Sequence, residues 1–305
     1  MGEPAAPRVA AVVVHWRRPA ATRACLAAIA ALQAPGACAV VVDNGSGDFD
    51  PAWLAPYPGA RLVRSETNRG FAGGSNLGMR AALAGGADWV WFLNDDAAPE
   101  PAALGALLAA AAGPQRPQLL GAKIVQAADP TRLDSVALDL ELPSGRARLL
   151  GHDEVDRGQY DALREPLAVT GCALLVSRRA CEQLGGFEER FFAYFEDADL
   201  CLRARRANLA VAAVPAARVR HDRAVAHAGR QSADSLYYSV RNHLVLLALH
   251  GPCAAWLSRL RSARVLAGYL AYAALRGGGS DARARISAVL DGYRAYERGE
   301  MGPRL

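Results

Sequence analysis

The chain has 305 residues, of which 52% are hydrophobic and 21% are charged. Such a chain buries a sizeable core, which excludes a disordered protein, and its length fits one large domain or one domain with an appendage. The formal net charge is +5, but the basic residues, all arginines except Lys123, scatter along the chain without a nucleic-acid-binding motif. We therefore expect no nucleic acid as a partner; the charge fits an anionic ligand or membrane surface better.

Cysteines and apolar runs limit the setting of the protein. The six cysteines contain no Cys-x-x-Cys pair, which argues against a disulfide framework and against structural zinc. The apolar run at residues 9–14 is too short for a signal peptide, and the runs at 244–249 and 265–275 fall short of the ~20 residues that span a bilayer. We expect a cytoplasmic protein without a transmembrane helix, with peripheral contact at the inner face of the membrane left open.

The first hundred residues alternate between strand-like and helix-like segments. Strands are predicted over residues 9–14, 38–43, 61–65 and 89–93, and helices over residues 19–32 and 74–83. This alternation of apolar strands with helices indicates an α/β fold with a mostly parallel sheet that is buried on both faces. Such sheets bind ligands at the carboxyl ends of their strands, where VVVDNGSGD, TNRGFAGGSN and LNDDA occur.

The rest of the chain divides into an irregular part and a regular part. Residues 126–165 are predicted to be loops that cover the site, with a strand pair near 133–142. A strand at 167–176, a short helix that ends at Gly185-Gly186, a helix at 199–207 and a strand that leads to His221 follow. The last part is helical at 235–249, 254–275 and 282–296. We therefore predict a sheet domain over residues 1–230 and a helical region over residues 231–305.

Two of the motifs suit a nucleotide, and each has an equally good structural explanation. Asp43 ends a strand, where a carboxylate accepts hydrogen bonds from a base or ribose, or closes an Asx turn. Gly70, Gly73 and Gly74 precede a helix predicted to start near Ser75, where they let backbone N–H groups approach a phosphate, or form a tight turn capped by Ser75. This loop is neither a Walker A loop nor a GxGxxG loop.

Three further groups suit metal binding and proton transfer. Asp95 and Asp96 follow a hydrophobic strand, and adjacent carboxylates there favour Mg²⁺ or Mn²⁺ over a solvated loop. The acids of FEDAD cap a helix, or act as a general base beside an aromatic lead-in that partly desolvates them. A lone His221 is usually structural, but next to Asp96 it completes a mixed nitrogen and oxygen site for such a metal.

Taken together, these segments resemble the inverting family 2 glycosyltransferases, in the branch of rhamnosyltransferases and galactofuranosyltransferases. The resemblance rests on seven segments in the same order: VVVHW, VVVDNGSGD, NRGFAGGSN, WFLNDDA, VTGCALLVSR, GGFEERFFAYFEDADLCLRAR and VRH. The tail segments YYSVRNHLVLL and DGYRAYERGEMG are similar as well. Only residues 126–165 lack characteristic features.

The resemblance implies a GT-A fold, which is a Rossmann-like sheet flanked by helices, here with a C-terminal helical extension. It implies that Asp96 binds Mg²⁺ or Mn²⁺ and that His221 completes the metal site, while Asn94 stands where many members have aspartate. Asp197 takes the position of the catalytic base, and Glu196 is the second choice. The residues assigned to the nucleotide-sugar donor are His15, Asp43, Asn68, Gly70, Gly73, Gly74, Asn76, Asn94 and Asp95.

The implied function is an inverting transfer of a sugar from a dTDP-rhamnose-like or UDP-sugar donor to a saccharide or lipid-linked acceptor. Its biological setting is the assembly of cell-surface polysaccharide. Arg259, Arg261 and Arg264 lie among apolar residues and suit a helix on an anionic membrane, or a helix packed on the core or on a second subunit. The main alternative is a catalytically silent nucleotide-sugar-binding scaffold; a nucleotidyltransferase would need a glycine-rich signature near the first strand that VVVHWRRPA lacks.

Overall fold

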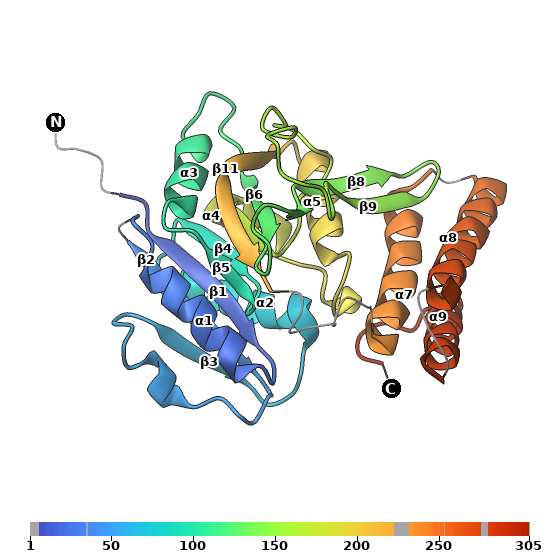
Figure 1. Ribbon diagram of the computed structural model, residues 1–305, viewed down its shortest axis with the longest axis horizontal. Coiled ribbons are helices and arrows are strands. Elements are labelled where there is room, and N and C mark those ends of the chain that lie inside the picture. Colours follow the sequence, from blue (N-terminus) through green and yellow to red (C-terminus); the bar gives the residue numbers. More distant parts are fainter. Residues whose placement is uncertain (1–5, 35, 223–231, 253, 276–279, 305) are drawn as a thin grey trace.

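A computed structural model describes residues 6–34, 36–222, 232–252, 254–275 and 280–304. In the first part of the chain, strands and helices alternate, and these strands build one half of a large sheet (Figure 1). The elements are β1 (Val9–His15), α1 (Pro19–Ala30), β2 (Ala37–Asn44), β3 (Arg61–Ser65), α2 (Gly70–Ala84), β4 (Trp89–Leu93), β5 (Ala97–Pro99) and α3 (Ala103–Ala111), with a 3-10 turn, η1, at Pro51–Leu54. The strands predicted here are confirmed to within one or two residues.

The middle of the chain adds the other half of the sheet and a hairpin. Its elements are β6 (Leu119–Gln126), β7 (Leu133–Ser135), β8 (Ala137–Glu141), β9 (Arg146–Leu150), β10 (Ala173–Ser177), α4 (Arg178–Leu184), η2 (Glu189–Phe191), α5 (Glu196–Arg206) and β11 (Val211–His221). The strand pair predicted near 133–142 is in fact two structures: β7 pairs with β6, and β8 pairs with β9 in a separate hairpin. The sequence interpretation missed β5, α3 and β6.

The large sheet is mixed, which corrects the expectation of a mostly parallel one. Its order is β3-β2-β1-β4-β10-β6-β11-β5, with β7 beside β6. The β1, β2, β3 and β4 strands are parallel, and so are β6 and β11, but β10 runs antiparallel to both of its neighbours. The α/β class is confirmed. The sequence could not reveal the direction of β10, because an apolar run has the same pattern in a parallel and an antiparallel buried strand.

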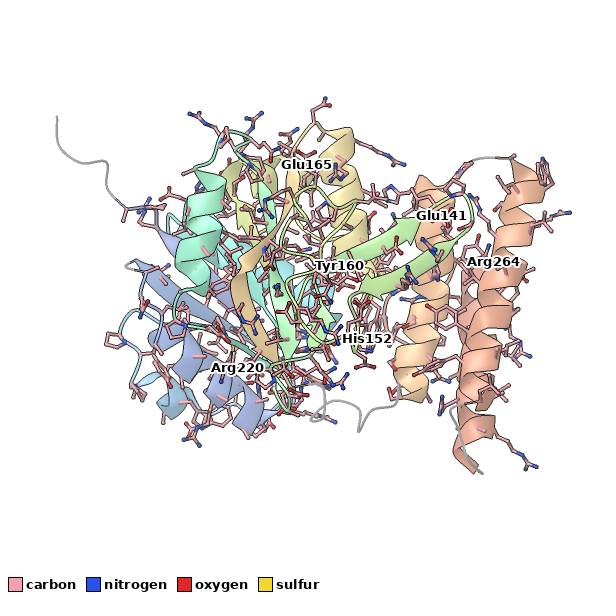
Figure 2. The ribbon with its side chains drawn as sticks, turned by 45° about the horizontal axis from the view of Figure 1, so that its top comes forward. Glu141, His152, Tyr160, Glu165, Arg220 and Arg264 are labelled. Carbon is pink, nitrogen blue, oxygen red and sulfur yellow. The ribbon has the colours of Figure 1, made fainter. Side chains whose placement is uncertain are left out.

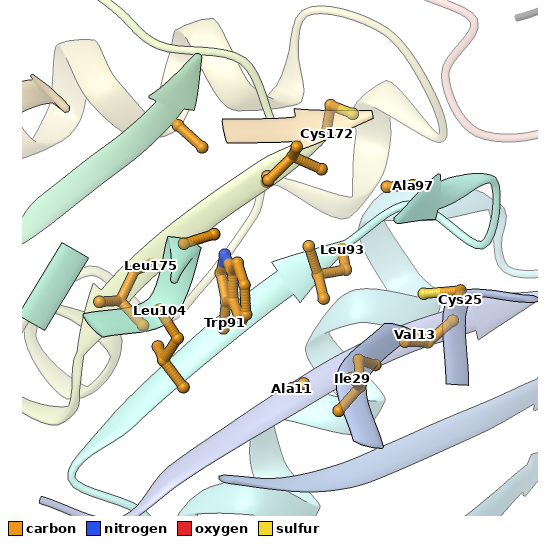
Figure 3. Packing of buried hydrophobic residues seen from close by; sticks show 14 of the residues in the cluster. Ala11, Val13, Cys25, Ile29, Trp91, Leu93, Ala97, Leu104, Cys172 and Leu175 are labelled. Carbon is orange, nitrogen blue, oxygen red and sulfur yellow. The ribbon is translucent and has the colours of Figure 1, made fainter. Parts of the chain in front are cut away.

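Side chains that alternate along β1 fill cores on both faces of the sheet. Val9, Ala11 and Val13 point to the face covered by α1 and α3, whereas Ala10 and Val12 point to the face covered by α2, α4 and α5. Figure 3 shows the first of these cores, where Trp91 of β4 packs near Leu104. Burial on both faces explains why these strands are continuous apolar runs.

Two predicted boundaries were wrong for reasons of close packing. The α2 helix begins at Gly70 and not near Ser75. Its glycines are required by close packing, since a Cβ at Gly74 would lie 2.7 Å from the Val14 side chain. Glycine there lets α2 approach β1, although it lowers helix propensity and hides the helix in the sequence. The segment 167–172 is not a strand; Ala168 and Val169 are fully buried there, and only the isolated bridge of Ala168 to Leu138 pairs it.

The last part of the chain forms a helical layer beside the sheet domain (Figure 1). The α7 (Ala233–His250), α8 (Ala255–Leu275) and α9 (Ser280–Arg298) helices share their own core, built around Leu236, Val240 and Val289. Each confirms a predicted helix. The predicted domain boundary at 230/231 lies outside the described residues, and the described helices are too short or too polar to cross a bilayer.

Candidate active site

The acids after β4 are held by an arginine from the loop between β1 and α1. Asp95 and Asp96 are buried, and the guanidinium of Arg18 lies between them. Its Nη1 donates to Oδ2 of Asp96 at 2.6 Å, and its Nε donates to Oδ2 of Asp95 at 3.1 Å, while its Nη2 donates to the other oxygen of Asp95. One cation therefore offsets the charge of two adjacent carboxylates.

The two carboxyls differ in their protonation. Burial raises the pKa of Asp95 to about 7, and this desolvation outweighs the attraction of Arg18. Burial acts on Asp96 too, but hydrogen bonds from His221 and Arg18 outweigh it and lower the pKa of Asp96 below its ordinary value. Of the two carboxyls, Asp96 is therefore the one whose ionised form the surroundings favour.

His221 links Asp96 to an acid from the irregular part of the chain. The Nε2 of His221 lies 3.1 Å from Oδ1 of Asp96 and 3.4 Å from Nδ2 of Asn94. Its Nδ1 lies 2.7 Å from Oδ2 of Asp134, a buried residue of β7. Burial acts to lower the pKa of His221, but Cys172, Asp134 and Asp96 together outweigh it and raise this pKa well above its ordinary value.

This arrangement suits a divalent metal held by few protein ligands. An imidazole whose far nitrogen contacts a carboxylate is oriented as metal-bound histidines usually are. Among the residues that the structure describes, no three His, Cys, Asp or Glu side chains surround a common point. Asp96 and His221 are the two side chains here that could hold a divalent ion, with the imidazole in its neutral form.

One loop joins this pair to the acids at the start of α5. The backbone N–H of Asn94 donates to the carbonyl oxygen of Cys172 at 3.0 Å, and the Cys172 side chain interacts with His221. The neighbouring residue, Gly171, donates its N–H to Oδ2 of Asp197 at 2.7 Å. Gly171 thus contacts Asp197, and the next residue, Cys172, interacts with His221. The structure therefore brings Asp96, His221 and Asp197 to one region.

Asp197 and Glu196 differ in their access to solvent. Glu196 is 6% exposed, and its Oε2 has no hydrogen-bond partner among the described residues. Asp197 is partly exposed, and its carboxylate accepts N–H bonds from Gly171 and Ala198. Burial raises the pKa of both carboxyls, and the charge of Asp197 raises that of Glu196 further. Of the two carboxyls, Asp197 is therefore the more accessible to solvent.

A strained turn, residues 191–195, leads into this helix. Phe192, Tyr194 and Phe195 have φ angles of 66°, 71° and 70°, in the left-handed region that bulky side chains avoid. Such conformations cost on the order of 1–3 kcal/mol each and cluster at functional sites. The α5 helix then begins at Glu196, three residues before the predicted start.

The end of β2 carries a network that orders the predicted donor loop. Asp43 closes an Asx turn by accepting from the N–H and Oγ of Ser46, and its Oδ2 faces Arg64 at 3.9 Å. Asn44, which the sequence interpretation passed over, donates to Oδ1 of Asn68 and to the carbonyl oxygen of Gly70, both at 3.0 Å. Asn68 therefore positions the start of α2.

Close packing accounts for the glycines at the start of α2 and for Asn76. A Cβ at Gly70 would lie 2.2 Å from the carbonyl oxygen of Phe192, and one at Gly73 would lie 2.8 Å from Cβ of Arg69. Asn76 is 2% exposed and exchanges hydrogen bonds with the backbone of Phe187. The assignment of Asn76 to the donor is therefore corrected: it ties α2 to the loop before η2.

His15 also requires correction. Its ring is fully buried, with Nδ1 2.7 Å from Oγ1 of Thr22 and Nε2 2.9 Å from Oδ1 of Asp48. Phe49 and Trp53 pack edge-on against the ring. His15 anchors the loop after β2 and has no face left for a donor in this structure.

Arg18 and Asp134 were missed for different reasons. Arg18 follows the first strand directly, so its place at the carboxyl end of a strand was a usable signal. Asp134 lies in the segment 126–165, where no local pattern marks it. Only the pairing of β7 with β6, next to β11, brings it to His221.

Comparison with known proteins identifies the family. Residues 7–243 match the family model described as "Glycosyltransferase like family 2". An N-acetylglucosaminyl-diphospho-decaprenol L-rhamnosyltransferase of Mycobacterium tuberculosis is 32% identical over 227 residues, which cover 68% of this chain and 74% of that protein. Galactofuranosyltransferase GlfT1 of the same organism is 40% identical over 128 residues, 41% of this chain and 42% of that protein.

A solved structure supports the fold. The mannosyltransferase PcManGT from Pyrobaculum calidifontis, in complex with GDP-Man and Mn²⁺, superposes with a TM-score of 0.61 at 16% identity, covering 97% of this chain and 88% of that one. The match to the family model spans the sheet and the loops that bear Asp96, Asp197 and His221. The chain therefore belongs to glycosyltransferase family 2 and has the GT-A fold.

Proposed function

We propose that the protein transfers a sugar from a nucleotide-sugar donor to the hydroxyl of a saccharide or lipid-linked acceptor, with inversion at the anomeric carbon. Asp197 accepts the proton of the acceptor hydroxyl as that oxygen attacks the anomeric carbon and the nucleoside diphosphate departs. The observation that carries this proposal is the loop Gly171–Cys172, which joins a partly exposed carboxylate to the Asp96–His221 pair.

Asp96 and His221 are the residues that we propose to hold Mg²⁺ or Mn²⁺. A bound divalent ion supplies positive charge for the diphosphate leaving group. In this assignment Asp134 orients the imidazole of His221 through Nδ1. Asp43, Asn94 and Asp95 are proposed to line the donor site, with Asn68 and the glycines of α2 shaping its edge.

The relatives guide the choice of substrates. The names of two relatives specify L-rhamnosyl transfer to a diphospho-decaprenol-linked sugar and galactofuranosyl transfer. We therefore propose a dTDP-rhamnose-like or UDP-sugar donor and a lipid-linked saccharide acceptor in the assembly of a cell-surface polysaccharide.

The outer face of α8 supports peripheral contact with a membrane. This face, as we use the term, consists of Trp256, Arg259, Leu260, Arg264 and Leu275 with the small exposed residues between them. Trp256 is 67% exposed, Leu260 60% and Leu275 85%. At about 100° per residue, Arg259 and Arg264 lie on opposite sides of Trp256 and Leu260, as in helices that lie in a lipid interface, and Leu275 lies next to Arg264 around the helix. The α8 helix contains no acidic residue, so two copies of this face would repel each other whereas an anionic bilayer would attract it.

Replacement of the proposed base tests the function. Asp197→Asn keeps the shape of the side chain but removes its basicity, so kcat should fall ~10²–10⁴-fold while donor binding stays close to that of the wild type. Glu182→Gln, an exposed acid of α4, is the matched control and should retain full turnover. Turnover is measured with a lipid-linked acceptor, and the anomeric configuration of the product by NMR.

Two results would contradict the proposal. Wild-type turnover in Asp197→Asn would remove Asp197 from the base role. Binding of a nucleotide sugar without transfer to any acceptor, in a wild-type protein that is folded, would favour the alternative of a silent binding scaffold.

A further inference from the structure

We infer that Arg241 and Asn242 of α7 are positioning residues for the reaction: they hold the 191–195 turn in the conformation that presents Asp197. This inference rests on the proposed role of Asp197. It assigns a task to the segment YYSVRNH, which lies far from that residue in sequence and contacts neither Asp96 nor His221 through any described interaction.

Asn242 gathers the carbonyl groups of the turn around one side-chain amide. Its Nδ2 lies 2.8 Å from the carbonyl oxygen of Phe191, 2.7 Å from that of Ala193 and 2.9 Å from that of Tyr194. Its Oδ1 accepts from Nε of Arg241 at 2.9 Å, and the side chain is fully buried. The amide is thus saturated, and both of its ends are fixed.

Arg241 fastens the same turn from the next position of the helix. Its Nη2 donates to the carbonyl oxygen of Phe191 at 3.0 Å, and its Nη1 donates to that of Gly302 at 2.7 Å. The guanidinium is fully buried against the ring of Tyr238, and no carboxylate of the described residues pairs with it. Burial of a cation without a counter-ion is costly, and an apolar side chain would fill the space more cheaply. We therefore infer that the role of Arg241 in the fold is to bind these carbonyl groups.

The turn needs such support because its backbone is strained. The left-handed conformations of Phe192, Tyr194 and Phe195 persist only where the surroundings over-determine them. The α7 helix supplies those surroundings: Tyr238 stacks on Phe192 at 5.0 Å, and His243 stacks on Phe195 at 4.8 Å. The hydrogen bonds and the ring contacts act on the same five residues.

The turn sets the place of the proposed base. Phe195 is the N-cap of α5, and its carbonyl oxygen accepts from the N–H of Asp199 at 3.0 Å. Asp197 lies two residues after the turn and meets the N–H of Gly171 at 2.7 Å. If the turn relaxed to ordinary φ angles, the first turn of α5 would shift, and a displacement of ~1 Å costs on the order of 10²-fold in rate.

The test compares near-isosteric variants of the full chain. Asn242→Leu removes the amide and keeps the volume, so we expect kcat to fall about 100-fold with the KM for the donor nearly unchanged. The acid limb of the kcat profile should also move to lower pH, because a loosened turn exposes Asp197 to water and lowers its pKa. Ser239→Ala, a conservative change at another buried residue of the same helix, is the control and should match the wild type.

Conservative variants separate positioning from folding. Arg241→Lys keeps the charge and part of the hydrogen bonding and should retain more kcat than Arg241→Met at equal Tm. Asn242→Gln keeps the amide on a longer stem and should fall between wild type and Asn242→Leu, which provides a readout if Asn242→Leu does not fold.

The inference is overturned if folded Asn242→Leu, or Asn242→Gln in its place, retains wild-type kcat and pH profile while Asp197→Asn loses turnover. It is also overturned if the variants lose donor binding and kcat in equal measure. Retention of turnover by Asp197→Asn would instead remove the proposed function itself, so the two failures are distinguishable.

Discussion

At the scale of single residues, the site is dominated by Arg18, which lies between Asp95 and Asp96. Arg18 donates to Oδ2 of Asp96, and Nε2 of His221 lies beside the other oxygen, Oδ1. An internal cation therefore holds the two acids together. Removal of one partner of a buried ion pair leaves an uncompensated charge, which costs more than the pair itself contributes.

The Arg18→Met variant tests this role. We expect the free energy of unfolding to fall by about 3 kcal/mol at pH 8, the lower end of the range for buried pairs because Arg18 is partly exposed. The loss should be smaller at pH 5.5, where Asp95, with a pKa of about 7, is already protonated in the native state. Mn²⁺ should raise the Tm of Arg18→Met more than that of the wild type, because it replaces the lost cation.

Urea unfolding at the two pH values provides the measurement for this variant. Arg17→Met, a change of the exposed neighbour, should have little effect at either pH. An equal loss of stability in Arg18→Met at pH 8 and pH 5.5 would show that Arg18 acts through packing and not through charge.

At the scale of elements, α7 buries an imidazole at its contact with the turn before α5. His243 is 5% exposed, stacks on Phe195 and meets the edge of Tyr269 at 6.0 Å. Burial lowers the pKa of His243 from 6.5 to about 4. Between these two values the unfolded chain binds a proton that the native protein does not bind.

This linkage makes the packing of α7 sensitive to acid. Because the unfolded state holds more protons, stability rises with pH from about 4 to 6.5 and is lost as the pH falls through that range, by up to about 3 kcal/mol. His243→Leu removes the titrating group, so its stability should change less between pH 6.5 and 4.5 than that of the wild type. The difference between the two urea-unfolding series isolates His243, and parallel series would refute the assignment.

At the scale of the whole molecule, the helical layer separates the outer face of α8 from the site by one helix. The α7 helix contacts both α5 and α8, and at interaxial distances of about 8–10 Å the start of α5 lies about 20 Å from that face. The α8 helix, with Arg264, lies at the far side of the helical layer from β1, β2 and β3 (Figures 1 and 2). A bilayer against α8 would therefore hold the site near the headgroups without burying it.

Vesicle sedimentation tests this placement without donor or acceptor. The wild type should bind vesicles that contain phosphatidylglycerol, bind pure phosphatidylcholine weakly, and dissociate as salt shortens the Debye length from about 10 Å to about 3 Å. The Arg259→Glu, Arg264→Glu double variant should bind at least about tenfold more weakly. The Arg23→Glu, Arg179→Glu double variant, with equal charge and exposed residues elsewhere, should bind almost as well as the wild type.

A second outcome identifies a different occupant of the face. If the wild type stays in the supernatant and instead dimerises in a way that Trp256→Ala with Leu260→Ala abolishes, a second copy covers α8 and the membrane proposal falls.

The elements most readable from sequence are those whose local pattern matches their burial. The β3 and β4 strands were predicted to the residue, and α4 ends where Gly185 adopts a left-handed cap. The start of α2 could not be predicted because its glycines, which lower helix propensity, are there for close packing. The β6 strand could not be predicted because its apolar run is interrupted by Gly121 and Lys123. In both cases tertiary contacts override the local preference.

The sequence by itself determined the α/β class and the family, because these depend on residue type, order and strand ends. The same motifs supply Asp96, Asp197 and His221, whose roles in the reaction are predictions. The tertiary structure alone decided that β10 reverses the sheet, that Arg18 and Asp134 meet Asp96 and His221, and that His15 faces inward. It also decided that Asn242 holds the turn before Asp197. The side-chain contacts among these join residues 48 to 87 positions apart, and His15 depends on which face of the strand its side chain presents. Local periodicity contains no information about either.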